Sequence, residues 1–525
     1  MKKKLYILFI PVLIQLWGCQ KDFLNRVPLD QLSDASFWTN EKDALYGVNS
    51  CYKDFDESYN TLYADCASDN AFSQFPWDGW QVQANGKMQP TNTGYSYFTY
   101  TTIRRCNWVL ENINSVPKMN EDLKKRFIGE VRFIRAYRYF LMVTHYGDVP
   151  LVTRVLELSE ANQPRTPKDQ VVNFIINELD TIADYLPESY SSEDVGRITK
   201  GAALSLKARM LLFYGKWKDA AAAAKEVMDL NVYSLFPDYE GLFLLENINN
   251  SEVILDVQYI IDYYSNWVVG VMPPPSQGGW SSLTPLQSLV DSYECIDGKT
   301  IDESPNYNLE KPWTNRDPRL SATVLLPGAP LGGIRYDPLG EESIDYWQKN
   351  NASKTAYSPK KYWYPLDQYN DMWNTGMNNI LIRYAEVILT YAEAKIEDNS
   401  IDNTVYDAID QVRLRAGMPA VDRTKYNTQE SLRELVRRER RVELAMEGLR
   451  WYDIIRWNLA EEVLNGKVYG SREGSVDPIT GEVTFSTADH IFVENRFFDP
   501  AKNYLWPIPQ SEIDINPNSI QNPGY

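Results

Sequence analysis

Histidine is scarce in this chain of 525 residues, and cysteine is both scarce and irregularly spaced. A histidine-rich zinc site or a Ser/His/Asp triad would have to use His145 or His490, because no other histidine occurs. The five cysteines show no metal-type spacing, so we expect no metal or other cofactor. Apart from Cys19, we expect the cysteines to be free and buried, although an oxidising compartment would permit a disulfide among Cys51, Cys66, Cys106 and Cys295.

Positive charge is also in deficit. The chain has 53 lysines and arginines against 71 acidic residues, which gives a formal net charge of -18. Nucleic-acid-binding proteins need a basic face, so this composition argues against a nucleic-acid partner. The hydrophobic content of 44% allows a chain of this length to bury a large core, in several domains or in one extended repeat architecture. Aromatic residues are abundant at 13%, more than an ordinary core requires.

The first 19 residues have the pattern of a secretory signal. Three lysines precede an apolar run over residues 5–17 that is too short for a comfortable membrane span. Gly18 directly before Cys19 resembles the lipobox of bacterial lipoproteins, in which the signal is cleaved before the cysteine and the thiol carries lipid. The sequence therefore predicts a cleaved signal peptide over residues 1–18, lipidation at Cys19 and a tether over residues 19–40. Burial of acyl chains, at about 0.8 kcal/mol per CH₂, would hold the mature protein on a bilayer.

The stretch over residues 431–457 is the most strongly patterned part of the chain. Apolar residues recur there at helical spacing, and Ser431 with Glu434 predicts a capping box at the start of an amphipathic helix. Glu439 and Glu443 fall within about 20° of Leu432, on the apolar side. Buried carboxylates need partners or a chemical role. Seven arginines in the same stretch leave three interpretations open: a structural scaffold, an acid/base site or an anion-binding surface.

Helical patterns recur along most of the chain and suggest antiparallel pairs. Small alanines over residues 202–224, with a break at Gly215, resemble a tetratricopeptide-type hairpin, although the match to the 34-residue pattern is loose. Residues 233–376 are rich in Pro, Gly, Asn and Tyr, with strand-like runs such as 253–261. The sequence therefore predicts a mainly α fold, a tetratricopeptide-like scaffold of helix pairs with a large irregular lobe containing short strands. The stretch over residues 65–100 and the tail after Gly466 are also expected to be irregular. Beside the 431–457 stretch, the predicted helices cover residues 41–55, 101–114, 130–145, 170–186, 202–214, 217–230, 286–293, 381–396, 404–416 and 450–464.

Six segments, spread over most of the mature chain, stand in a characteristic order. They are RFIRAYRYFLMVTHYGDVPL (132–151), ARMLLFYGKWKDAAAAAKEVM (208–228), RDPRLSATV (316–324), IRYAEVILTYAEAK (382–395), RRERRVELAMEGLRWYDIIRW (437–457) and YLWPIPQSEIDINPNSIQNPGY (504–525). Together they resemble the SusD/RagB family, the surface glycan-binding lipoproteins of the Bacteroidota. Residues 20–22, directly after Cys19, similarly resemble the short acidic signal that sends such lipoproteins to the cell surface.

The resemblance implies about four tetratricopeptide-like helix pairs. The N-terminal helical region would cover residues 41–232. The C-terminal region would cover residues 233–525, with the irregular lobe at 233–376 and further helix pairs at 381–464. It also implies glycan capture without catalysis, a lipid anchor in the outer membrane at the cell surface, and a TonB-dependent transporter of the SusC type as partner.

Two aromatic loops are the candidate ligand site. Sugar rings pack C–H faces on aromatic rings while their hydroxyls bond to carboxylates and carboxamides, and rigid loop aromatics provide such a surface at little entropic cost. The loops over residues 65–81 and 259–280 occupy regions in which starch-binding relatives build an aromatic arc, although they share no motif with those relatives. Alternatively, a given aromatic only anchors its loop to the body. The candidate ligand-binding residues are Asn70, Phe75, Trp77, Asp78, Trp80, Tyr264, Trp267 and Trp280.

Three hypotheses for function follow. The first is a non-catalytic glycan-binding lipoprotein. The second is a glycosidase that uses Glu439 and Glu443, since glycosidase carboxylates stand roughly 5 to 9.5 Å apart. The apolar surroundings of that pair favour instead a buried ion-pair network with arginines such as Arg413, Arg415 and Arg450. The third is a tetratricopeptide-type interaction subunit of the transporter complex that takes glycopeptide or peptide ligands. The sequence leaves open which glycan is bound and whether a calcium ion supports the lobe.

Overall fold

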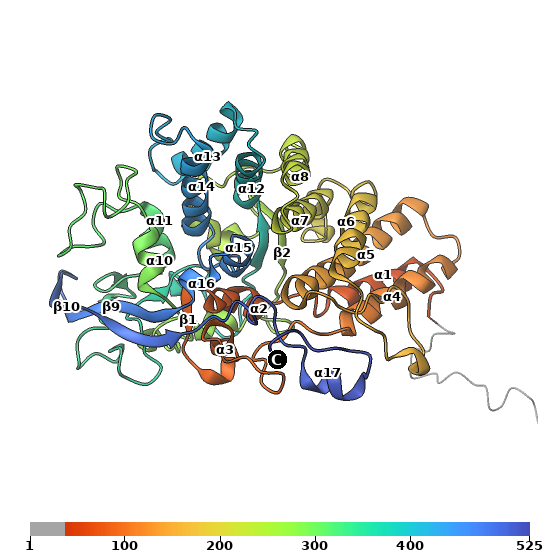
Figure 1. The fold of residues 1–525 in the computed structure, drawn as a ribbon, viewed down its shortest axis with the longest axis horizontal. Helices are drawn as coiled ribbons and strands as arrows, with labels where there is room; N and C mark the ends of the chain where they lie inside the picture. The colour runs from red at the N-terminus through yellow and green to blue at the C-terminus, as the bar shows by residue number, and fades with distance from the viewer. Residues whose placement is uncertain (1–36) are drawn as a thin grey trace, which may run out of the picture.

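The computed structural model describes residues 37–525. The predicted signal peptide, the lipidation site at Cys19 and residues 19–36 of the predicted tether therefore lie outside the described residues. Helices dominate the fold, and short strands are confined largely to one side of the molecule (Figure 1). This is the mainly α architecture that the sequence predicts. Among the helices of residues 37–525, none combines the length and apolarity needed to cross a membrane.

Helices of the N-terminal half pack against one another in chain order. The longest, α5 (Glu121–Tyr146), contacts α4 (Thr101–Asn112) and α6 (Lys168–Ala183), and α1 (Glu41–Tyr52) packs on α4 and α5. The sequence predicted only the second half of α5, because its first turns are polar. The helix begins earlier because the side chain of Asn120 accepts hydrogen bonds from the backbone N–H groups of Asp122 and Leu123.

The irregular lobe is an insertion between two neighbouring helices. α7 (Lys200–Phe213) and α8 (Trp217–Asp229) approach closely through buried alanines and are separated by Gly215 with a φ of 68°. α8 then packs directly on α12 (Tyr384–Glu397), although more than 150 residues separate them in sequence. α12 contacts α13 (Asn403–Arg415) and α14 (Gln429–Glu443). The pairs α1–α4, α5–α6, α7–α8 and α12–α13 match the predicted number.

The lobe contains short strands, as predicted, and they pair in two-stranded antiparallel sheets. β2 (Val253–Val257) pairs with β8 (Asn379–Arg383), so the predicted helix over residues 381–396 begins only at Tyr384. The other pairs are β1 (Ala71–Ser73) with β3 (Leu283–Pro285), β4 (Val324–Leu325) with β7 (Ser358–Pro359), and β5 (Pro330–Leu331) with β6 (Ile334–Arg335). The short helices are α2 (Ser58–Tyr63), α3 (Gln81–Ala84), α9 (Val268–Val271), α10 (Gln287–Ser292), α11 (Pro318–Thr323), α16 (Ala460–Val463) and α17 (Gln510–Ile515).

The tail after Gly466 is not irregular throughout, so that prediction was wrong. β9 (Gly466–Val476) and β10 (Val483–Arg496) form a long antiparallel hairpin that extends from the body at the left of Figure 1. Its strands are rich in polar residues, and their longest apolar run is the three residues 491–493. Backbone pairing, interrupted by irregularities in register, holds them together where the side-chain pattern gives no signal.

The stretch over residues 431–457 forms two helices, the second of which begins at Arg450, where the predicted helix over residues 450–464 begins. α14 is capped three residues earlier than predicted, because Thr428 and Ser431 form the reciprocal capping box. It ends at Glu443, and Gly448 then adopts a φ of 77°. A Cβ atom there would lie 2.1 Å from the carbonyl oxygen of Thr61, so only glycine fits this turn. α15 (Arg450–Arg456) follows the turn.

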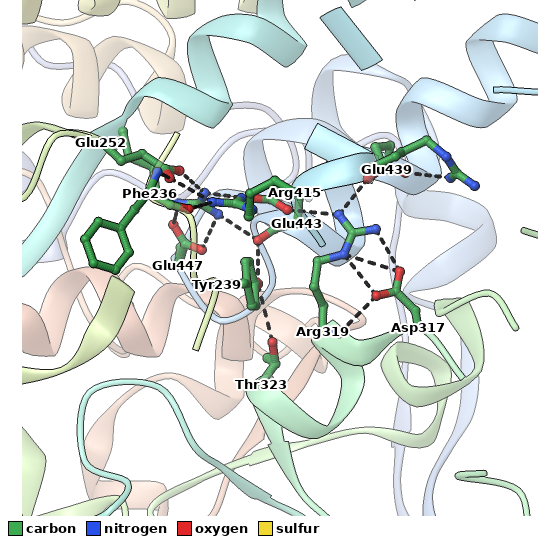
Figure 2. Close-up of polar contacts among 12 residues, drawn as sticks. Phe236, Tyr239, Glu252, Asp317, Arg319, Thr323, Arg415, Glu439, Glu443 and Glu447 are labelled. Atoms are coloured by element: carbon green, nitrogen blue, oxygen red, sulfur yellow. Dashed lines mark hydrogen bonds and ion pairs between the residues drawn. The ribbon is translucent and has the colours of Figure 1, made fainter. Parts of the chain in front are cut away.

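A buried ion-pair network joins α14 to the lobe (Figure 2). Arg383 lies 2.7 Å from Glu443, and Arg319 lies 2.6 Å from Glu439 and 2.9 Å from Glu443. The predicted partners Arg413 and Arg415 do bind these carboxylates. The predicted role of Arg450 was wrong, because Arg450 pairs with Asp69 at 2.7 Å. Arg319 and Arg383 come from α11 and β8 and were not predicted.

Neither glutamate of this network is suited to acid/base catalysis. Burial raises the pKa of Glu443, but Arg415, Arg383 and Arg319 outweigh it and hold the pKa below its usual range. Burial and the two guanidinium groups of Arg319 and Arg413 have the same opposing effects on Glu439, whose pKa is also lowered. Both carboxylates are therefore ionised at neutral pH, enclosed and fully paired. The pair is part of a scaffold.

Four cysteines and one of the two histidines lie in the core. Cys51, Cys66, Cys106 and Cys295 are all free and buried. His145 is buried and stacks on Trp451 with ring centroids 4.2 Å apart, and burial lowers its pKa to about 3. A neutral, stacked imidazole of this kind packs against its neighbours and has no exposed edge for catalysis.

Replacement of Glu443 tests the network. We expect Glu443→Gln to lower the free energy of unfolding by roughly 3 to 5 kcal/mol, because it leaves buried guanidinium groups without their counter-charge. Urea unfolding measures this. The matched control is Glu303→Gln, which removes an exposed carboxylate 2.7 Å from Lys425 and should cost at most about 1 kcal/mol. Equal costs for the two variants would contradict the assignment.

The stabilisation that Glu443 gives the native protein should also fade as pH falls below the unfolded-state pKa of about 4.3, since its folded pKa is lowered.

Candidate functional site

The two aromatic loops predicted from the sequence lie side by side. β1 of the first loop pairs with β3, which directly follows the second, in a register that sets Phe72 opposite Thr284. The ladder continues beyond the strands, since the backbone N–H of Gln74 donates to the carbonyl of Ser282 at 2.8 Å. The pairing brings two segments more than 200 residues apart into one surface.

A third segment, residues 369–378, completes this surface. The side chain of Asn374 accepts a hydrogen bond from the backbone N–H of Asp262 at 2.9 Å and donates to its carboxylate at 2.6 Å. Trp373 packs against Trp280 with ring centroids 5.0 Å apart. The sequence analysis did not single out Trp373, although it stands in an aromatic and asparagine-rich stretch. We call the whole the aromatic surface: Phe75, Trp77, Tyr263, Tyr264, Trp267, Trp280 and Trp373.

The rings of the aromatic surface are exposed yet held in place. Trp77 is 75% exposed, and Tyr264, Trp267 and Trp280 are each just over 40% exposed. Stacking on a second ring fixes the orientation of such a side chain while leaving part of it accessible. The stacked pairs are Trp77 on Phe75 (4.6 Å between centroids, 12° between planes), Tyr264 on Tyr259 (5.1 Å, 5°) and Trp267 on Tyr59 (5.7 Å, 28°).

Helix α2 anchors both loops through its tyrosine and serine. The hydroxyl of Tyr59 donates to the backbone carbonyl of Asp78 in the first loop. The hydroxyl of Tyr259 in the second loop accepts a hydrogen bond from the backbone N–H of Ser58 at 2.7 Å. Burial raises the pKa of Asp78 to about 7, and its Oδ2 atom is buried without a partner among residues 37–525. Asp78 therefore retains hydrogen-bonding capacity at the base of the aromatic surface.

A polar pocket of about 300 Å³ lies beside Tyr264. Its lining includes Asp56, Glu57, Asn60 and Arg138, none of which the sequence analysis singled out. Arg138 is only 4% exposed, and its Nε atom and the Oδ1 atom of Asn60 are buried with no partner in the described part of the chain. Such atoms can serve a polar ligand. No group of three or more His, Cys, Asp or Glu side chains within residues 37–525 is arranged to hold a metal ion.

Two predicted site residues lie in the interior. Trp80 has no exposed area and stacks on Tyr95 with centroids 4.8 Å apart. Asn70 is 1% exposed, donates to Asp65 at 3.2 Å and accepts from Arg441 at 3.0 Å. Both side chains fasten the first loop to the body, the alternative role that the sequence left open. Phe75, Trp77, Asp78, Tyr264, Trp267 and Trp280 do gather at the aromatic surface.

Two family models match consecutive parts of the chain. The model described as the SusD family matches residues 240–525, and the model described as "Starch-binding associating with outer membrane" matches residues 22–212. The first alone spans more than half of the chain. The chain belongs to the SusD family. The predicted resemblance is thereby confirmed.

SusD-like proteins of known structure share the whole fold. A SusD-like carbohydrate-binding protein from Bacteroides fragilis is 31% identical, with a TM-score of 0.83 over 92% of this chain and 99% of that one. A laminarin-binding SusD-like protein is 25% identical, with a TM-score of 0.72 over 93% of this chain and 100% of that one. A SusD-like protein from Bacteroides ovatus is 27% identical over 89% of this chain and 84% of its own length.

Two tryptophans of this SusD-family chain differ in burial, so their replacement by alanine should affect stability differently. Trp80→Ala should lower the free energy of unfolding by about 3 to 5 kcal/mol, because it empties a fully buried site. Trp77→Ala should change it by no more than about 0.5 kcal/mol, since the side chain is exposed. Chemical unfolding of the two variants beside the parent measures both values. A stable Trp80→Ala would show that this indole is not part of the core.

Proposed function

We propose that this protein is a non-catalytic, cell-surface glycan-binding lipoprotein. It captures oligosaccharides on the aromatic surface and passes them to a SusC-like TonB-dependent transporter of the outer membrane. The observation that carries the proposal is the set of exposed, stacked rings on two loops, which are joined to each other and to the segment of Trp373 by hydrogen bonds.

The geometry of the aromatic surface supports sugar binding. Aromatic faces offer flat apolar area to the C–H faces of a pyranose ring, and rings already held by stacking lose little entropy on binding. Asp78 and the polar pocket beside Tyr264 offer acceptors and donors for hydroxyl groups. Polar groups of this kind fix the orientation of a ligand that aromatic contacts retain.

The absence of catalysis is supported by the fate of the carboxylate pair considered for a glycosidase. Glu439 and Glu443 are buried, and each is paired with at least two arginines. A substrate has no access to them. Two solved SusD-like structures, 31% and 25% identical, are described as carbohydrate-binding and laminarin-binding, which agrees with a binding role.

Anchoring and transport rest on the sequence. The lipobox before Cys19 supports a lipid anchor, and one matching family model is described as associating with the outer membrane. Delivery to a SusC-like transporter follows from membership of the family and is part of the proposal.

Removal of surface rings tests glycan capture. We expect Trp77→Ala and Trp267→Ala each to weaken retention on a cognate polysaccharide by about tenfold or more, because a central aromatic typically contributes about 2 kcal/mol. Native affinity gels with a polysaccharide panel provide the measurement. Tyr46→Ala is the control, since Tyr46 is 50% exposed on α1, away from the aromatic surface. Unchanged retention in both tryptophan variants would remove the aromatic surface from consideration.

Replacement of the predicted lipidated cysteine tests the anchor. Cys19→Ala should abolish fatty-acid labelling and release the protein from the outer-membrane fraction, because no acyl chain can then be attached. Metabolic labelling and fractionation of the native host measure this. Cys51→Ala, which removes a buried free cysteine, should leave labelling intact. Labelling that persists in Cys19→Ala would contradict the assignment.

A further inference from the structure

The segments that build the aromatic surface contain no positive charge. Residues 226–298 contain neither lysine nor arginine, and the same is true of residues 362–382. Residues 54–103, which supply the first loop and much of the polar pocket, contain one basic residue, Lys87. Lys87 follows Gly86, which lies against the backbone of Phe497 in the C-terminal tail. The chain has 53 basic residues, yet three stretches that nearly lack them converge on the aromatic surface. These segments therefore bring little positive charge to it.

Negative charge, by contrast, is distributed over the same segments. Asp262 and Asp371 are exposed in the second and third segments. The carboxylate of Asp371 accepts a hydrogen bond from the backbone N–H of Trp373 at 2.8 Å, so it lies at the edge of the ring cluster. Asp78 lies beneath the first loop. A ligand stacked on these rings therefore lies close to the carboxylates of Asp262 and Asp371, whereas Asp78, whose pKa burial raises to about 7, is only partly ionised at neutral pH.

The polar pocket follows the same rule even though a guanidinium group lines it. Arg105 and Asp54 pair at 3.4 Å, which leaves Asp56 and Glu57 facing the buried Arg138. Burial raises the pKa of Glu57, and the negative charges of Asp56 and Asp54 raise it further. Two carboxylates therefore face one guanidinium group at this position, although the raised pKa of Glu57 makes it lose its charge earlier as pH falls. An anionic group entering the pocket would meet net negative charge.

One basic side chain borders the aromatic surface. Lys354 is exposed, and its backbone N–H donates to the side chain of Gln74 at 3.2 Å, next to Phe75. It belongs to a different loop and makes no ion pair within the described residues. A single flexible ammonium lacks the planar fork with which arginine binds carboxylates and sulfates bidentately.

We infer that the aromatic surface selects neutral glycans and excludes polysaccharides that carry uronate or sulfate groups. The inference rests on the proposed function. Neutral sugars can donate hydroxyl hydrogen bonds to the carboxylates and stack their C–H faces on the rings. Anionic groups would be repelled, and the arginine that lines the polar pocket, Arg138, is buried and already faces Asp56 and Glu57. Like charges brought together in a binding interface suppress the wrong partner and are felt most at low ionic strength.

A matched pair of ligands tests the selection. A polysaccharide panel first identifies a neutral glycan whose retention depends on Trp77, and a lightly carboxymethylated form of that same glycan is then compared with it in affinity gels. We expect the carboxymethylated form to bind at least about tenfold more weakly at low salt, and the difference to shrink as salt is added. In the same panel, polygalacturonate, alginate and sulfated polysaccharides should not be retained.

Two variants connect the selection to the residues. Glu57→Gln should narrow the ratio between the neutral and carboxymethylated forms, because it removes negative charge from the pocket. Glu303→Gln, which removes an exposed carboxylate outside the aromatic surface and the polar pocket, should leave the ratio unchanged. If the parent protein retained an anionic glycan and Lys354→Gln abolished that retention, Lys354 would be part of an anion subsite and the inference would be overturned.

The outcomes separate the inference from the proposed function. Trp77-dependent retention of an anionic polysaccharide, or a carboxymethylated form that binds as well as the neutral one, would overturn the charge selection and leave glycan capture standing. Preferential retention of chitosan would show selection for a cationic glycan and would also overturn it. If no glycan were retained, glycan capture itself would fail, and the charge selection with it.

Discussion

A buried ion-pair network holds the scaffold and the irregular lobe in one arrangement. It consists of six buried carboxylates and six buried or half-buried cations, and each of them has at least one partner of opposite charge. The carboxylates are Glu252, Glu294, Asp317, Glu439, Glu443 and Glu447, and the cations are Arg319, Lys361, Arg383, Arg413, Arg415 and Arg438. Each ion lost its hydration on folding, so each depends on its partners. The members come from α11, β8, α13, α14, the turn between α14 and α15, and loops of the lobe, as Figure 2 shows for the central part. A shift of any one of these elements would leave a buried charge without its partner.

This constraint bears on the binding surface because the lobe supplies two of its three segments. The second loop and the stretch around Trp373 are parts of an insertion that leaves the scaffold after α8 and returns at β8. Arg383 in β8 and Glu252 beside β2 are both members of the network. The rings of the aromatic surface therefore stand on a base whose position is fixed by buried ion pairs, while the loops that carry them contain only short helical turns. Binding surfaces of this kind combine variable loops with a rigid support.

Sequence patterns were sufficient for most of the longer helices, because apolar periodicity is a local signal, and loop aromatics singled out two segments that the structure brings side by side. They could not separate Trp77 from Trp80, which are three residues apart in the same loop. One indole is exposed and the other lies on Tyr95, and only the packed fold decides which. The sequence predicted Arg415 of α13 as a partner of Glu443, because it belongs to the preceding helix pair. It did not predict Arg319 and Arg383, which come from α11 and β8. Arginine pairing across such distances leaves no mark on the sequence. The hairpin β9–β10 escaped detection because its apolar residues are few and a mostly polar stretch over residues 486–490 interrupts their alternation in β10.

The three-residue ladder between β1 and β3 has a further consequence for the order in which the molecule forms. It closes a loop of 212 residues, with most of the N-terminal helices inside it. Contacts between helices that follow one another can form early, whereas a pairing across such a separation must wait until the intervening chain has condensed. The hydrogen bonds that bring the aromatic loops together are therefore among the late events of folding. A chain that is still partly unfolded carries its aromatic loops apart and presents no assembled surface to sugar.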